Sequence, residues 1–161
     1  LITSSAASDV YKRQPTLNEV IEIIPENIFL NIELKGENTA IETNKVIIEY
    51  INRSNFTPSS FIVSSFRWDE LVEFRNTNKD VPIAILVDSL YKIDIAIKLA
   101  KEINAFAINP NNEFLTKEIV KKVQSFNIKV YPYTINDLSS IKRMKSMGVD
   151  AIITDFPERI N

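Results

Sequence analysis

The feature that most constrains the fold of this chain is a regular alternation of short apolar runs and amphipathic segments. Nearly continuous apolar runs occupy residues 61–63, 81–87, 105–108 and 151–153. Runs of this kind are typical of strands in a parallel sheet that is buried on both faces. The longer segments between them carry apolar residues at helical spacing. Strands that alternate with helices in this way predict a parallel α/β fold.

We expect strands near residues 28–35, 60–65, 82–87, 105–108, 128–131 and 150–154. Helices are expected to begin near residues 16, 39, 68, 93, 116 and 137. Thr16 with Glu19, and Thr39 with Glu42, have the spacing of a capping box at a helix start. Gly148 is expected to end the last of these helices.

The arrangement of these units favours a barrel over a dinucleotide-binding sheet. The chain has only two glycines, Gly36 and Gly148, and therefore lacks the glycine-rich turn that binds a pyrophosphate. We predict a TIM-type (β/α)8 barrel. Such barrels typically have about 250 residues, so the chain is expected to hold about six C-terminal βα units of an incomplete barrel.

The first residues are expected to be foreign to this fold. Residues 4–14 read SSAASDVYKRQ, which is the translation of a common sequencing-library adapter. A disordered tail rich in Ser and Ala is the alternative that composition alone permits. We therefore expect residues 1–14 to be a non-native tail, residues 15–161 to be the C-terminal part of one barrel domain, and the natural N-terminus to be missing.

One predicted strand differs from the others because its polarity alternates. Asn31, Glu33 and Lys35 share one face of the segment from Leu30 to Lys35. A charged side chain on a buried strand needs a partner, a metal ion or water. Polar ends of strands in a parallel barrel usually mark the active site. This face is therefore the predicted functional site.

Composition excludes several other classes of site. The formal net charge is −2, and Lys/Arg and Asp/Glu are interspersed, so the chain has no basic patch of the size that nucleic-acid binding requires. It contains no cysteine and therefore no disulfide or thiolate metal site, and it contains no histidine. No apolar run reaches transmembrane length, and we expect no stable membrane insertion. Abundant Ile, Asn and Lys indicate an AT-rich, bacterial genome.

Five segments resemble motifs of the glycerophosphodiester phosphodiesterase family. They are Pro15–Glu19 (PTLNE), Asn31–Lys35 (NIELK), Val63–Phe66 (VSSF), Tyr131–Asn136 (YPYTIN) and Gly148–Pro157 (GVDAIITDFP). Each motif is weak alone, but five in the right order are specific. The resemblance implies a barrel of the phospholipase C-like phosphodiesterase kind. It also implies an enzyme of lipid metabolism that uses a divalent metal ion, Mg²⁺ or Ca²⁺, to hydrolyse glycerophosphodiesters to an alcohol and glycerol 3-phosphate.

The resemblance also implies roles for four residues. Glu33 matches a carboxylate metal ligand of the family, and Lys35 would stabilise the charge on the phosphate as the catalytic cation. Phe66 and Tyr133 would bind substrate, although Tyr133 stands where the family usually has Trp. The purely structural alternatives are that Glu33 only pairs with Lys35, that Lys35 is a solvated lysine at the end of the strand, and that Phe66 packs in the core.

The family's histidine general acid and base lie upstream of the matching region, and this chain has no histidine. We therefore expect the chain by itself to be inactive. A related phospholipase that cleaves phosphatidylinositol or sphingomyelin, and a non-catalytic barrel that serves as a binding module, are the alternatives. A cytoplasmic location is expected, with a secreted or periplasmic parent left open.

Overall fold

The computed structural model describes residues 13–25 and 27–160, which alternate between helices and parallel strands. The helices and strands are α2 (Leu17–Ile23), β1 (Leu30–Glu33), α3 (Thr39–Arg53), β2 (Phe61–Ser65), α4 (Trp68–Thr77), β3 (Ile83–Val87), α5 (Ile93–Glu102), β4 (Ala107–Pro110), α6 (Lys117–Gln124), β5 (Lys129–Val130) and α7 (Leu138–Met147). Three short 3-10 helices lie in the loops: η1 (Pro58–Ser60), η2 (Leu90–Lys92) and η3 (Pro157–Arg159).

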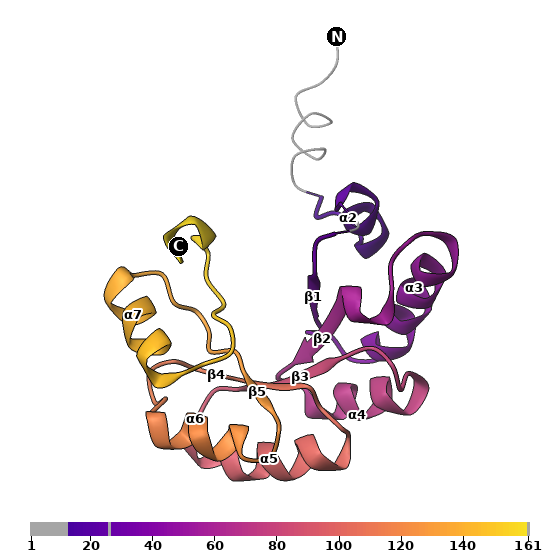
Figure 1. Ribbon diagram of the computed structural model, residues 1–161. Helices are drawn as coiled ribbons and strands as arrows, with labels where there is room; N and C mark the ends of the chain where they lie inside the picture. Colours follow the sequence, from indigo (N-terminus) through magenta and orange to yellow (C-terminus); the bar gives the residue numbers. More distant parts are fainter. Residues whose placement is uncertain (1–12, 26, 161) are drawn as a thin grey trace.

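The strands form one parallel sheet in the order β1-β2-β3-β4-β5. Figure 1 shows that this sheet curves into an open arc, with the helices along its outer side. Every neighbouring pair of strands is joined by a crossover that contains a helix, as parallel pairing requires. The predicted fold is confirmed as an incomplete α/β barrel.

The main hydrophobic core lies between the outer face of the sheet and the surrounding helices. Val63, Ile85 and Ile108, from three adjacent strands, are fully buried and belong to the same core cluster as Leu71 and Phe74 of α4. A second, smaller cluster on the inner face contains Ile62, Ala84 and Ala107, with Tyr131 packed against it. Burial on both faces explains why the strands read as continuous apolar runs.

Local sequence signals set most of the helix ends. The Thr16 hydroxyl accepts the Glu19 N–H while the Glu19 carboxylate accepts the Thr16 N–H at 2.7 Å, so the first predicted capping box is confirmed. Asp137 caps α7 in the same manner by accepting the Ser140 N–H. Gly148 ends α7 with φ of 80°, a conformation that favours glycine.

The second predicted capping box does not form. The N-cap of α3 is Asn38, not Thr39, and its side chain makes no capping hydrogen bond. The buried carboxylate of Glu70, on α4, instead accepts the N–H groups of Asn38, Thr39 and Ala40 at 2.6, 3.0 and 2.9 Å. The prediction was wrong because a residue 30 positions away satisfies the helix terminus, which a local motif does not reveal.

The sixth predicted strand is also absent as a strand among the described residues. Residues 150–153 lie beside β5 and make separate hydrogen bonds, from Asp150 N–H to the Val130 carbonyl and from Ile153 N–H to the Pro132 carbonyl. Pro132 has no N–H to donate to a ladder. The segment therefore follows the sheet edge without a continuous ladder.

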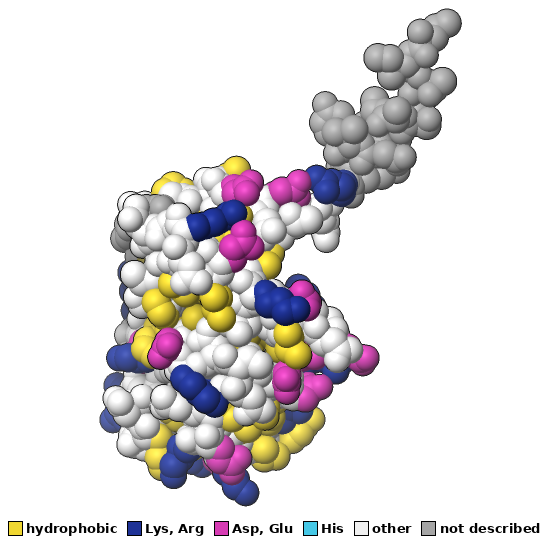
Figure 2. Space-filling model, turned by 90° about the vertical axis from the view of Figure 1, so that its right-hand side faces the viewer, with side chains coloured by type: hydrophobic (Ala, Val, Ile, Leu, Met, Phe, Trp, Pro, Cys, Tyr) yellow, Lys and Arg dark blue, Asp and Glu magenta, His cyan; other side chains and the backbone are white. Residues whose placement is uncertain are grey.

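The predicted adapter-derived tail falls mostly outside the described residues. Of this segment, Arg13 and Gln14 are described, and Arg13 forms an exposed ion pair with Glu19 at 2.5 Å. On the face seen in Figure 2, basic, acidic and hydrophobic side chains are interspersed. No helix in the described part of the chain is both long and apolar enough to span a bilayer.

Candidate functional site

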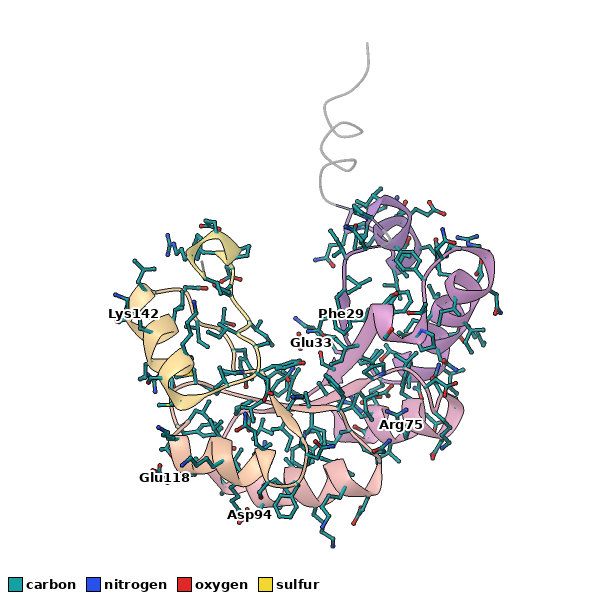
Figure 3. All side chains as sticks on the ribbon, in the orientation of Figure 1. Phe29, Glu33, Arg75, Asp94, Glu118 and Lys142 are labelled. Atoms are coloured by element: carbon teal, nitrogen blue, oxygen red, sulfur yellow. The ribbon has the colours of Figure 1, made fainter. Side chains whose placement is uncertain are left out.

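The polar face of β1 lies on the inner side of the arc. Exposure alternates along the strand, with Asn31 and Glu33 exposed and Ile32 half-buried between them. Figure 3 shows Glu33 at the hollow between the two arms of the molecule. Lys35 lies two residues after the last residue of the strand, beyond its carboxyl end. Asn31 and Glu33 therefore share one face of β1, as predicted, and this face is open to solvent.

Glu33 and Lys35 form a loose ion pair. The Lys35 Nζ lies 3.7 Å from a Glu33 carboxylate oxygen, a distance beyond that of a hydrogen bond. The Lys35 side chain is 78% exposed and the Glu33 side chain 34% exposed. An exposed pair of this kind contributes little to stability. Both charged groups are therefore accessible to a ligand that enters the hollow.

Phe66 and Tyr133 meet at the same end of the sheet. Their rings lie edge to face, with centroids 5.6 Å apart and an interplanar angle of 87°. Phe66 is 46% exposed, so it is not a core residue. The Tyr133 hydroxyl donates a hydrogen bond to the Val87 carbonyl at 3.0 Å. The two predicted substrate-binding residues are thus in contact with each other.

Electrostatics connects Tyr133 to the β1 site. Burial raises the pKa of the Tyr133 hydroxyl to about 12, and the negative charges of Asp88 and Glu33 add to this increase. The fold thus places Lys35 beside Glu33 and Phe66 beside Tyr133.

Asp88 is a functional candidate that sequence reasoning missed. It lies directly after β3, and Lys92 pairs with it at 2.8 Å. The hydrogen bonds from Lys92 and Ser89 lower the pKa of its carboxyl group. Its position after the apolar run 83–87 was the signal, because the carboxyl ends of barrel strands carry the functional side chains.

Asn109, on β4, is a second residue that was missed. It is 1% exposed, and its Oδ1 accepts no hydrogen bond within the described part of the chain. Its register partner on β3 is Leu86, which places Asn109 on the inner face of the sheet. The sequence around Asn109 has no alternation of polar and apolar residues, so the sequence did not indicate that this amide lies on the inner face of the sheet.

Other polar residues near the site have structural partners. The Ser64 hydroxyl donates to Asn31 Oδ1 at 2.9 Å, and the Ser65 hydroxyl donates to the Leu34 carbonyl at 2.6 Å. Neither hydroxyl donates its hydrogen bond to a group that could act as a general base. The Thr154 hydroxyl donates to Asn136 and accepts the Phe156 N–H, so it caps the turn that follows it.

The described residues of the candidate site supply only part of a metal site. Glu33 offers an accessible carboxylate, and hard divalent cations prefer such oxygen ligands. The described residues contain no group of three or more Asp, Glu, His or Cys side chains that could hold a metal ion. Glu33 can therefore serve as one ligand of an ion whose other ligands lie elsewhere.

The sequence matches the model of the glycerophosphoryl diester phosphodiesterase family over residues 4–159. An uncharacterised Bacillus subtilis protein, YqiK, is 31% identical over 159 residues, which are 96% of this chain and 63% of that protein. A glycerophosphodiester phosphodiesterase of Bacillus altitudinis is 32% identical over 154 residues, 90% of this chain and 60% of the enzyme. The chain thus spans less than two thirds of the length of these relatives.

Solved structures share the fold over a similar extent. An Oleispira antarctica phosphodiesterase in complex with the product sn-glycerol-3-phosphate superposes with a TM-score of 0.77 at 25% identity, covering 91% of this chain and 59% of that one. A Thermotoga maritima glycerophosphodiester phosphodiesterase gives a TM-score of 0.75 at 21% identity, covering 98% and 67%.

Proposed function

Because the chain belongs to the glycerophosphoryl diester phosphodiesterase family, we propose that it is part of an enzyme that hydrolyses glycerophosphodiesters to an alcohol and glycerol 3-phosphate. The observation that carries this proposal is the accessible Glu33–Lys35 pair at the carboxyl end of β1. A solved relative that binds sn-glycerol-3-phosphate supports a small-molecule substrate of this class. The substrate would enter the hollow on the inner side of the arc.

The charged residues of the site have complementary roles toward a phosphodiester. Glu33 would serve as one ligand of a divalent ion, Mg²⁺ or Ca²⁺, which when bound neutralises charge on the phosphate. Lys35 would place its ammonium against the phosphate oxygens, where charge builds up during displacement. In the free chain the two groups hold each other at 3.7 Å, which is weak enough for a ligand to separate them.

The aromatic residues would position the substrate. Phe66 is exposed on the side of the hollow, while Tyr133 is fixed by its hydrogen bond to Val87. The edge-to-face contact holds the Phe66 ring against Tyr133 and limits its rotation. Because Tyr133 keeps its proton at neutral pH, it would contribute an uncharged wall beside the phosphate.

The 161-residue chain by itself is proposed to be inactive. Hydrolysis needs a general acid and a general base, and the family's histidines for these roles have no counterpart in a sequence with zero histidines. The parent enzyme would supply them upstream of residue 15. Recovering that upstream sequence separates three functions: histidine motifs support the phosphodiesterase, another motif set supports a related phospholipase, and loss of the histidines supports a non-catalytic binding barrel.

The test is a pair of substitutions in the full-length enzyme. Glu33→Gln removes the charge that binds the ion, so activity should fall and added metal should restore part of it. Lys35→Met removes the cation near the phosphate, so kcat/KM should fall by roughly 100-fold or more, and added metal should not rescue it. Metal titrations of kcat/KM for both variants measure the difference.

The exposed pair of Glu42 and Lys45 on α3 provides a matched control, because it has the same charges at 2.7 Å on a helix. Glu42→Gln and Lys45→Met should leave kcat/KM unchanged. Thermal melts of all four variants in chelator identify any loss of folding. Full activity of folded Glu33→Gln and Lys35→Met at limiting metal would show that the polar face of β1 is not the active site.

A further inference from the structure

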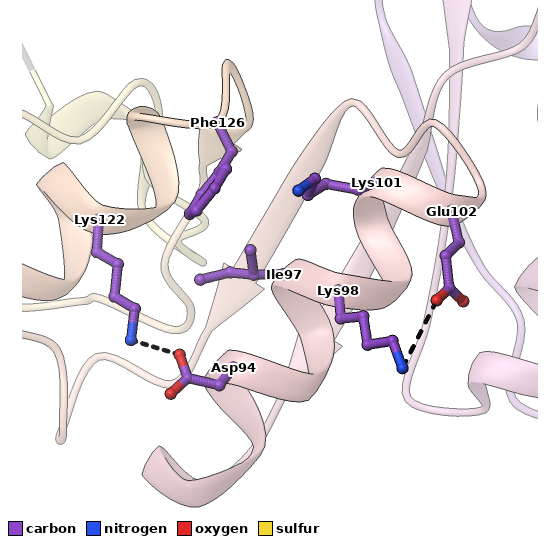
Figure 4. Close-up of a pocket in the computed structure, with 7 residues that line it drawn as sticks. All are labelled: Asp94, Ile97, Lys98, Lys101, Glu102, Lys122 and Phe126. Atoms are coloured by element: carbon purple, nitrogen blue, oxygen red, sulfur yellow. Dashed lines mark ion pairs between the residues drawn. The ribbon is translucent and has the colours of Figure 1, made fainter.

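A groove lies between α5 and α6, among the helices on the outer side of the arc (Figures 1 and 4). We call it the α5–α6 groove. Its volume is about 390 Å³, which is in the range of small-molecule sites. One wall is a single face of α5 and the other is the end of α6 with the residues that follow it. The lining residues are Asp94, Ile97, Lys98, Lys101 and Glu102 on the first wall and Lys122 and Phe126 on the second.

Two contacts between the walls bound the groove at its ends. At one end the Lys122 Nζ lies 2.5 Å from a carboxylate oxygen of Asp94. At the other end the Lys101 Nζ lies 5.1 Å from the centroid of the Phe126 ring. Asp94 and Lys101 are seven positions apart, which is about 10 Å along a helix. The groove therefore has a defined length that suits a small elongated ligand.

The surface between these two contacts is apolar. Figure 4 shows the Ile97 side chain pointing from α5 into the space between the walls. Ile97 is 6% exposed and belongs to the main hydrophobic core, whereas Phe126 is 44% exposed. An apolar group that lies over Ile97 and against Phe126 would remove this surface from water. The ligand should therefore have an apolar body.

The charged side chains that line the groove favour an anion. Three lysines face two carboxylates, so the lining residues have a net charge of +1. Asp94 holds Lys122 closely, but the Lys98 Nζ lies 4.0 Å from Glu102, which is a loose pair. Lys101 forms no ion pair within the described part of the chain. One negative charge would balance this excess, and a second would exceed it.

We propose that the α5–α6 groove binds an amphiphilic monoanion, a carboxylate with an alkyl chain such as a fatty acid. The carboxylate would pair with Lys101 and Lys98, which are three positions apart and lie on the same face of α5. The chain would lie along Ile97 and Phe126. This inference goes beyond the proposed function, because the groove is on the opposite side of the sheet from Glu33 and a ligand there would not compete with the substrate.

The first test is a titration of decanoate, below its micelle concentration, into the 161-residue chain by isothermal titration calorimetry. Acetate carries the same charge without the chain, and decyltrimethylammonium carries the same chain with the opposite charge. We expect saturable binding of decanoate with one site per chain. Both control ligands should bind at least tenfold more weakly, because each lacks one of the two features that the groove recognises.

Four variants locate the site. Lys101→Met keeps most of the side-chain volume and removes the charge, and Phe126→Ala removes the apolar wall. Each should weaken decanoate binding roughly threefold or more. Glu102→Gln frees Lys98 and should strengthen binding, an effect that partial unfolding would not produce. Lys121→Met, at an exposed lysine of α6 that does not line the groove, is the matched control and should leave binding unchanged.

Three outcomes would overturn the proposal. The first is the absence of saturable decanoate binding. The second is equal binding of decyltrimethylammonium, which would indicate a site that recognises only the alkyl chain. The third is unchanged binding in folded Lys101→Met and Phe126→Ala, which would place the ligand elsewhere, for example on the open edge of β1. Because the assay measures binding without turnover, its result does not depend on the proposed hydrolysis.

Discussion

At the scale of single residues, Tyr133 shows how surroundings set the chemistry of a side chain. Its ring packs against Phe66, and its hydroxyl donates to Val87. Burial, then Asp88 and Glu33, raise the pKa to about 12 from the usual value near 10. A raised pKa means that the folded state holds the proton more tightly than the unfolded state. The stabilisation is therefore complete below about pH 10 and is lost as pH rises to about 12.

We predict that Tyr133→Phe removes a tyrosine absorbance component that titrates near pH 12 rather than near pH 10. The measurement is the difference between the pH titrations of wild type and variant at 295 nm. Asp88→Asn should lower the pH at which this component titrates, because it removes a nearby negative charge. The denatured wild type, in which the component should titrate near 10, is the control. If the absorbance component that Tyr133→Phe removes titrates near pH 10 in the folded wild type, the assignment of the raised pKa to Tyr133 is wrong.

At the scale of elements, Glu70 joins α4 to the start of α3. Its carboxylate accepts three backbone N–H groups, from Asn38, Thr39 and Ala40. Burial opposes the ionisation of Glu70, but these hydrogen bonds outweigh it and lower the pKa of the carboxyl group. The negative charge also interacts favourably with the positive end of the helix dipole. The orientation of α3 therefore depends on a side chain from the next helix.

We predict that Glu70→Gln lowers the free energy of unfolding by about 1–3 kcal/mol, because an amide oxygen accepts weaker hydrogen bonds and its NH₂ group faces backbone donors. Urea denaturation near pH 7 measures the change. Glu73→Gln, an exposed residue on the same helix, is the matched control and should change stability by less than about 0.5 kcal/mol.

The stability difference between wild type and Glu70→Gln should also depend on pH. Because the pKa of Glu70 is lowered on folding, its stabilisation is present above the unfolded pKa near 4.5 and is lost as pH falls through the folded value. The difference in stability between wild type and Glu70→Gln should therefore shrink below about pH 4.5. A difference that stays constant down to pH 3 would show that the charge of Glu70 has no role in the cap.

At the scale of the whole molecule, the arc leaves strand edges accessible. In the described sheet β1 pairs only with β2, and its other edge is open. The opposite edge, at β5, is followed by residues 150–153 through separate hydrogen bonds. Phe29, beside the open edge, is 52% exposed. Unpaired strand edges with exposed apolar residues promote association between chains.

We predict that the 161-residue chain self-associates reversibly as its concentration rises. Sedimentation velocity over a range of concentrations measures the effect. Phe29→Lys places a charge beside the open edge and should shift the equilibrium toward the monomer without lowering the melting temperature. Ile95→Lys, at a residue of similar exposure on α5, is the control and should leave association unchanged. A monomeric wild-type chain at all concentrations would contradict this account.

The sequence alone determined the alternation of strands and helices and the polar face of one strand. The nearly continuous apolar runs at residues 81–87 and 105–108 indicated a parallel sheet covered on both faces, and Ala84, Ile85, Ala107 and Ile108 are indeed fully buried. The period of two from Asn31 to Lys35 placed its polar side chains together because a strand has only two faces. These features depend on neighbours within a few positions, which a sequence displays directly.

Only the tertiary structure decided which distant residues meet. Glu70 replaced the local cap of α3, and Pro132 interrupted the ladder that residues 150–154 were predicted to join, because each outcome depends on the partner segment. Phe66 and Tyr133, which follow different strands, came into contact because the sheet brings together the loops at the carboxyl ends of its strands. Sequence periodicity fixes which face of an element is buried, but it carries no distance between elements, and charge interactions across a pocket depend on that distance.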